Sequence, residues 1–185
     1  MKFRPKNASL TLLSLVALHS TSCFALSELI GGDMKFHGTV VALPCSIAPG
    51  SETIGVDFKQ TSIKDIYSNQ KTRMTPFTVH LENCSTGVFN SVSVTLSGIE
   101  DTALPNHLAI TSGGQGNASG VGIGLEETDG TAIKLNEATT PQKINANNMD
   151  LTYNAYLQGE PDAINQQTIS YGTFSATATF TINYQ

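Results

Sequence analysis

Apolar and polar residues alternate along most of the chain after residue 25. This period of two is typical of strands with one buried and one solvated face. Four runs show it most clearly, with apolar positions at Phe77, Val79 and Leu81; Val92, Val94 and Leu96; Val121, Ile123 and Leu125; and Leu151, Tyr153, Ala155 and Leu157. A further strand is expected over Gly38–Ile47, and only residues 62–67 show the spacing of a helical turn.

Both ends of the chain continue this alternation. At the C-terminus the even positions are apolar or aromatic and the odd positions are Ser, Thr or Asn; the even residues are Phe174, Ala176, Ala178, Phe180, Ile182 and Tyr184. By pattern alone this is an ordinary terminal core strand. Residues 26–37 place Ile30, Gly32, Met34 and Phe36 on one face. That pattern predicts a strand, and it is also compatible with a frayed end or an extension of the next strand.

Clusters of Gly, Pro, Asp and Ser separate the alternating runs, at residues 48–51, 112–114, 128–130 and 159–162. Short strands interrupted this often favour an antiparallel β-sandwich. The 185 residues show no linker and no internal repeat. We therefore expect a single all-β domain after the N-terminal region.

The first 25 residues have the composition of a secretory signal peptide. Three cations lie within residues 2–6, residues 10–18 are mostly apolar, and Cys23 and Ala25 supply small residues before a cleavage point. The apolar stretch is too short for a membrane-spanning helix, which needs about 20 residues. A lipid anchor on Cys23 is the competing interpretation. We expect the mature chain to be exported.

Two cysteines, Cys45 and Cys84, remain after such a cleavage. In an exported protein an even pair indicates a disulfide, and closing a loop of this length could stabilise the fold by about 4 kcal/mol. A zinc or redox site would need a closely spaced cysteine pair or clustered histidines, and the sequence has neither. No metal and no cofactor are expected.

The charge and the remaining motifs argue against two further classes of function. A formal net charge of −5 leaves no basic surface for nucleic acid. His37, His80 and His107 are scattered, and no GxSxG or HExxH motif is present. The glycine run over residues 113–124 departs from the phosphate-binding pattern at Ser119, which favours a surface loop leading into a strand. No catalytic residue is predicted, and an enzyme is not expected.

The two ends, taken with the cysteine spacing, resemble the subunits of chaperone–usher fimbriae, or pili, of Gram-negative bacteria. The similarity is to the type 1 and S fimbrial group and, within it, to minor subunits. It rests on the following features: GGDMKFHGTVV at 31–41, PCSI at 44–47, FTVHLENCS at 77–85, IGL at 123–125, Gly172 fourteen residues from the end, and Tyr184 in the penultimate position.

This resemblance implies an incomplete immunoglobulin-like β-sandwich over residues 38–185, preceded by a donor-strand extension at 26–37 and a signal peptide at 1–25. A periplasmic chaperone would lend the missing strand, and at the outer-membrane usher the extension of a neighbouring subunit would replace it. The donor face would be Ile30, Gly32, Met34 and Phe36. The chain's own groove would be lined by Gly172, Phe174, Ala176, Ala178, Phe180, Ile182 and Tyr184.

The function implied is that of a structural subunit of an adhesive fimbria at the cell surface, with the chaperone, the usher and neighbouring subunits as partners. The absence of tryptophan argues against an antibody-like module, whose core packs that residue on its disulfide. Two alternatives remain open. One is a secreted β-sandwich module that binds a carbohydrate or receptor, and the other is a subunit that ends the fibre.

Overall fold

The computed structural model describes residues 31–40, 44–85, 87, 89–111 and 116–185. The chain divides into two units, Met1–Thr39 and Val40–Gln185, which are described separately. The predicted signal peptide and Ile30 lie outside the described residues. No helix in the described part of the chain is long and apolar enough to cross a membrane.

In the first unit, residues 31–39 form neither helix nor strand, and all of them are exposed. The side chains of Met34 and Phe36 are 79% and 85% exposed. An extended segment becomes a strand only when its backbone groups pair with a neighbour, and residues 31–39 make no such pairing within the described part of the chain. The strand predicted for this segment is therefore not formed here.

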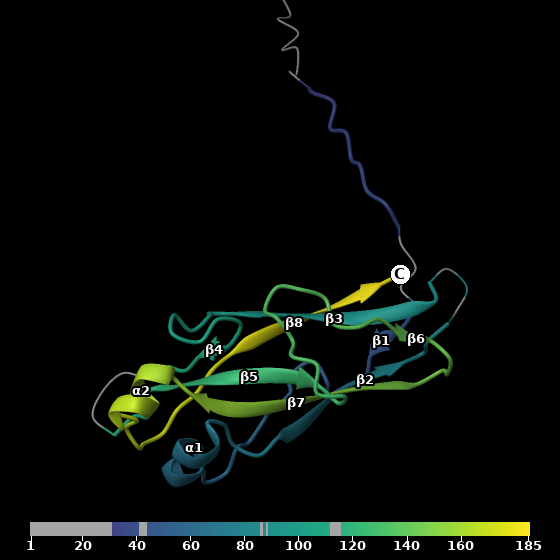
Figure 1. Cartoon of the computed structure of the whole chain (residues 1–185). Coiled ribbons are helices and arrows are strands. Elements are labelled where there is room, and N and C mark those ends of the chain that lie inside the picture. Colours follow the sequence, from purple (N-terminus) through teal and green to yellow (C-terminus); the bar gives the residue numbers. More distant parts are fainter. Residues whose placement is uncertain (1–30, 41–43, 86, 88, 112–115) are drawn as a thin grey trace, which may run out of the picture. The chain divides into compact units, whose positions relative to one another are not determined.

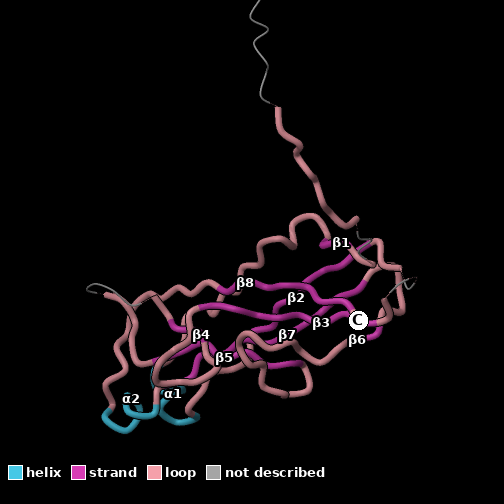
Figure 2. The backbone as a smooth tube through the Cα atoms, turned by 90° about the horizontal axis from the view of Figure 1, so that it is seen from above, coloured by secondary structure: helices cyan, strands magenta, loops and turns pink. Residues whose placement is uncertain are grey.

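Residues 44–185 form two antiparallel sheets packed face to face (Figure 1). The larger sheet has the order β1 (Ser46–Ile47), β2 (Thr75–Glu82), β7 (Met149–Gly159), β5 (Val121–Glu127), β4 (Leu108–Ala109). The smaller sheet has the order β6 (Gln142–Lys143), β3 (Ser91–Gly98), β8 (Ala178–Tyr184). Helices α1 (Ile63–Asn69) and α2 (Pro161–Gln166) lie together at one end of the sandwich, and the C-terminus lies at the other (Figure 2).

The core lies between the sheets, where alternate residues of β2, β3, β5 and β7 meet. These four strands confirm the four predicted runs, and α1 confirms the helical turn predicted at 62–67. The most deeply buried members of the alternating face are Val79, Leu81, Val92, Val94, Leu151 and Tyr153. Each fully buried aliphatic side chain contributes about 1.5–3 kcal/mol to folding.

Two predicted strands are wrong in their extent. Among the described residues of Gly38–Ile47, β1 is the part that forms a strand, and residues 38–40 are irregular and exposed. The terminal strand begins at Ala178 rather than at Phe174. Alternation reports which face of a segment is apolar, whereas a strand also requires a backbone partner. The described residues 38–40 and 174–177 have no ladder partner.

One helix was missed by the sequence analysis. The cluster at 159–162 was interpreted as a turn, and it leads directly into α2. Pro161 opens that helix and Asp162 lies in its first turn. Both are recognised signals of a helix start, because proline needs no N–H partner there and an acidic side chain favours the positive end of the helix dipole.

Candidate functional site: an open groove between the sheets

A groove of about 750 Å³ opens between the two sheets. Residues 52–58, which follow β1, form one bank, and residues 174–180, which include the start of β8, form the other. The floor consists of side chains from the sandwich strands: Phe77, Val79, Leu96, Leu108, Ile123, Leu125 and Ala155. The groove therefore opens directly onto the hydrophobic core.

The two banks resemble strands whose neighbour is missing. Ile54, Val56 and Phe58 are half-buried, and the residues between them are exposed. Residues 52–58 make no backbone–backbone hydrogen bond within the described part of the chain. On the other bank, β8 is paired with β3 along one edge only, among the described residues. An apolar groove beside backbone without strand partners is the geometry that recognition by strand addition uses.

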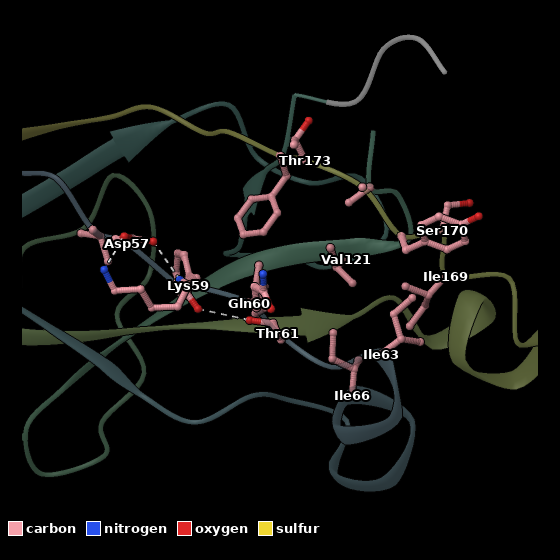
Figure 3. A pocket seen from close by; sticks show the side chains of 17 residues that line it. Asp57, Lys59, Gln60, Thr61, Ile63, Ile66, Val121, Ile169, Ser170 and Thr173 are labelled. Carbon is pink, nitrogen blue, oxygen red and sulfur yellow. Dashed lines mark hydrogen bonds and ion pairs between the residues drawn. The ribbon is translucent and has the colours of Figure 1, made fainter. Parts of the chain in front are cut away.

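Two phenylalanines meet across the groove. The ring centroids of Phe58 and Phe174 are 5.8 Å apart, with the ring planes tilted by 51°. Beyond them the groove continues into an end cavity of about 740 Å³ beside the helices, whose apolar lining includes Ile63, Ile66, Val121 and Ile169 (Figure 3). The groove and the end cavity share three lining residues, Val56, Phe58 and Phe174.

A tight turn holds the backbone next to Phe58 (Figure 3). The backbone N–H of Lys59 donates to Oδ1 of Asp57 at 2.8 Å, and its ammonium donates to Oδ2 at 2.6 Å. These contacts hold the pKa of the Asp57 carboxyl below its ordinary value, chiefly through the hydrogen bond from the Lys59 side chain. Lys59 itself has a positive φ of 55°, and the hydroxyl of Thr61 donates to the carbonyl of Phe58 at 3.3 Å.

The opposite bank begins where the backbone at Gly172 passes close to the backbone at Gly116. Gly172 has a φ of 154°, and an added Cβ would collide with the carbonyl of Gly116. Next to it, the N–H of Thr173 donates to that same carbonyl at 3.1 Å, and the N–H of Ala118 donates to the carbonyl of Thr173 at 2.9 Å. Only glycine fits this contact. The contact directs the chain into the bank that carries Phe174.

The C-terminal end of β8 is tied to the disulfide. Cys45 and Cys84 are bonded, which confirms the predicted pair, and the bond joins the residue before β1 to the chain just after β2 within one sheet. The hydroxyl of Tyr184 donates to the carbonyl of Cys45 at 3.0 Å. Burial raises the pKa of Tyr184, an effect that its hydrogen bond to Cys45 opposes.

Comparison with known protein families shows which family this chain belongs to. The model of the family described as "Fimbrial protein" matches residues 34–185. The chain belongs to the fimbrial protein family. It is 40% identical over 173 residues to the putative minor fimbrial subunit PmfF of Proteus mirabilis, covering 94% of this chain and 95% of that one. It is 31% identical to the fimbrial adapter PapK of Escherichia coli, covering 91% and 97%.

Solved structures give the same fold for this family member. The P pilus rod subunit PapA superposes with a TM-score of 0.64 at 20% identity, covering 77% of this chain and all of that chain. A chaperone–usher pilus subunit structure gives a TM-score of 0.65 at 22% identity, covering 84% and 96%. The predicted family and the predicted fold class, an incomplete immunoglobulin-like sandwich, are both confirmed.

The residues predicted for the site do not all lie together in this fimbrial protein. Four predicted groove residues line the groove, namely Phe174, Ala176, Ala178 and Phe180. Gly172 lines the end cavity instead, while Ile182 and Tyr184 pack against the core without lining the groove. Gly32, Met34 and Phe36 lie in the other unit, where they are exposed. Ile30 lies outside the described residues.

The sequence analysis missed the bank at 52–58. Its signal was present, because Ile54, Val56 and Phe58 alternate with Thr53, Gly55 and Asp57. The same rule of period two would have found it. Within the described residues no group of three or more His, Cys, Asp or Glu side chains could hold a metal ion.

Proposed function

We propose that this fimbrial protein is a structural subunit of an adhesive fimbria that is polymerised by strand donation. The observation that carries the proposal is the groove between residues 52–58 and 174–180, where core side chains and unpaired backbone are open to a partner. A periplasmic chaperone would fill this groove first. The N-terminal extension of another subunit would then replace the chaperone strand at the outer-membrane usher, and the fibre would reach the cell surface.

The proposed organisation is a signal peptide at 1–25, a donor extension at 26–37 and a pilin domain at 38–185. The donor face is Ile30, Gly32, Met34 and Phe36. Gly38 and Val40 continue the same alternation, and the side chain of Val40 is fully exposed. The extension has an apolar face but no neighbouring strand, and the groove has an apolar lining but no strand to fill it. The two surfaces are therefore complementary.

The physics of this exchange requires no nucleotide and no catalytic group. Each large apolar side chain that enters the groove gains about 1.5–3 kcal/mol, and each backbone hydrogen bond adds about 0.5–1.5 kcal/mol. A strand with several such residues completes the core and supplies the driving force. We therefore assign the chain no catalytic residue, no cofactor and no enzymatic activity.

The end cavity favours a subunit that accepts a further strand over one that ends the fibre. A terminating subunit would need this part of the groove filled by its own side chains. Here about 740 Å³ remains open beside Val121 and Ile169. The open cavity thus supports a subunit within the fibre, with neighbours on both sides.

Expression in the periplasm tests this proposal. Residues 26–185 are produced with and without the chaperone encoded with the fimbria, and the soluble protein is purified and unfolded in urea. Recovery only as a one-to-one complex with the chaperone is expected, because the sandwich lacks a strand. A version that begins at Gly38 controls for donation by the chain's own extension. A stable monomer of that version, unfolding cooperatively without chaperone, contradicts the proposal and favours a secreted binding module.

A further inference from the structure

We propose that a polar cavity beside α1 binds one unit of a neutral saccharide. This α1 cavity has a volume of about 510 Å³ and lies between residues 58–65 and residues 69–75. Among its described lining residues, Phe58 alone also lines the groove between the sheets, so the two sites are separate. The inference goes beyond the proposed function and does not depend on it.

The α1 cavity has the size of a small-molecule site but an unusual lining. Ligand cavities in proteins measure about 300–1,000 Å³ and are lined mostly by apolar side chains. Here nine of the ten described lining residues have polar side chains, and Phe58 is the exception. Such a lining suits a ligand rich in hydroxyl groups, because an apolar ligand would cover these polar groups without giving them partners.

Five of the polar side chains have no hydrogen-bond or ion-pair partner among the described residues. They are a guanidinium, a carboxylate, an amide and two hydroxyls, from Arg73, Asp65, Gln60, Ser62 and Thr75. Ser62 directly precedes α1, yet its side chain makes no capping hydrogen bond. All five groups can therefore bind a ligand without first breaking a contact within the protein.

Two of these groups carry opposite charges and remain apart. Asp65 and Arg73 line the same cavity and form no ion pair with each other. A carboxylate accepts hydrogen bonds and a guanidinium donates them, whereas a hydroxyl group does both. Neighbouring hydroxyls of one sugar ring can thus donate to Asp65 and accept from Arg73. Hydrogen bonds with a charged partner are about twice as strong as those between neutral groups.

The charges favour a neutral ligand over a phosphate or a carboxylate. Lys71, the other cation of the lining, already lies with its ammonium 3.7 Å from Oε2 of Glu126 and 4.7 Å from the ring centre of Tyr156. Arg73 is then the one unpaired cation of the described lining. An anion bound to it would be repelled by the Asp65 carboxylate, and a neutral polyol would not.

Hydrogen bonds to the backbone hold the cavity in shape. The N–H of Thr72 donates to the carbonyl of Leu157 at 2.9 Å, and the hydroxyl of Thr72 accepts from the N–H of Leu157 at 3.0 Å. The side-chain amide of Asn69 donates to the carbonyl of Asp65 at 3.1 Å. A cavity whose walls are already fixed loses less entropy when a ligand binds.

Titration with simple sugars, followed by NMR, tests the site. The isotope-labelled subunit, in complex with unlabelled chaperone, is titrated with the methyl glycosides of glucose, galactose and mannose. Cyclohexanol, a ring of similar size with a single hydroxyl, is the control ligand. A subunit that is recovered as a free monomer is titrated in the same way, so failure of the proposed function leaves this test intact.

At least one glycoside is expected to shift the amide signals of residues 60–75 saturably, and cyclohexanol is expected to shift none of them. Asp65→Asn and Arg73→Ala are each expected to raise the Kd of that glycoside about tenfold or more, because each removes a charged partner of the sugar. Lys64→Ala changes a neighbouring exposed cation outside the cavity lining, and it is expected to leave the Kd within about twofold.

Asp65 and Arg73 are both exposed, so unchanged signals from the rest of the domain verify that the variants fold. The proposal is overturned if none of the three glycosides gives saturable shifts at residues 60–75. It is equally overturned if the Kd is the same in Asp65→Asn, in Arg73→Ala and in the natural subunit.

Discussion

Gly172 illustrates how one residue positions a whole bank of the groove. A Cβ at this residue would collide with the Gly116 carbonyl, and φ is 154°. The chain therefore comes close enough to residues 116–118 for two backbone hydrogen bonds to form. The N–H of Thr173 donates to the carbonyl of Gly116, and the N–H of Ala118 donates to the carbonyl of Thr173. In the sequence, Gly172 was notable only for its distance from the C-terminus. The reason for a glycine becomes visible only when residues 56 positions apart along the chain are brought together.

Replacement of Gly172 by alanine is expected to destabilise the chaperone-bound subunit by more than 1 kcal/mol, because strain from the unfavourable φ adds to the steric collision. The measurement is the urea midpoint of the purified complex. Gly50→Ala is the matched control, since Gly50 also has a positive φ, of 90°, but has no atom within 4 Å of an added Cβ. Equal effects of the two substitutions would show that the contact with Gly116 is unimportant.

Inward and outward positions could be predicted residue by residue wherever the period of two was regular. The even residues from Phe174 onward are mostly half-buried and the odd residues are mostly exposed, as predicted. The contact between Phe58 and Phe174 could not be predicted. It depends on how two distant segments cross the open side of the sandwich, and no local pattern encodes that.

At the scale of elements, the N-terminal extension and the bank at 52–58 are incomplete in complementary ways. Residues 31–39 have an apolar face and no partner within the described part of the chain. Residues 52–58 have an alternating face on the core and make no backbone–backbone hydrogen bonds among themselves or to other described residues. The sequence predicted the first as a strand and overlooked the second. Neither forms a strand alone, because pairing is a property of two segments.

The phase of the extension can be tested with neighbouring substitutions. Phe36→Arg is expected to abolish incorporation of the subunit onto its neighbour, because a charge would enter an apolar groove. His37→Arg, on the opposite face, is expected to leave incorporation within about twofold of the natural level, since the side chain stays in water. The readout is the amount of subunit in purified fimbriae, with periplasmic chaperone complex as the control for folding. Similar incorporation of both variants would disprove the proposed donor face.

At the scale of the whole molecule, the smaller sheet depends on the last strand. β8 pairs with β3 over seven residues, from Val92↔Tyr184 to Gly98↔Ala178. The backbone N–H groups of Asn90 and Ser91 also donate to the carbonyl of Gln185, at 2.8 and 3.0 Å. The sandwich and its strand-rich character were predictable from alternation, whereas the two-residue strands β4 and β6 were too short to give a periodic signal.

Deletion of Thr181–Gln185 is expected to abolish recovery of the chaperone complex, because it removes four of the seven β8 pairs and the hydrogen bond from Tyr184 to Cys45. Recovery is measured by co-purification with the tagged chaperone. Thr181→Ala, which changes only an exposed side chain of the same strand, should be recovered at the natural level. Undiminished complex from the deletion would refute the role of β8 in the acceptor site.

The Cys45–Cys84 bond also determines how a fibre under tension would carry its load. A pull on the N-terminal extension reaches the domain at Cys45, just before β1, which has only two paired residues. The disulfide passes that force directly to the end of β2, which is held to β7 by seven pairs. The force thereby reaches β2 without passing through residues 46–74, which include the bank at 52–58. Tension along such a fibre would therefore reach the bank at 52–58 through the strand bound in the groove, and not through the chain's own N-terminal segment.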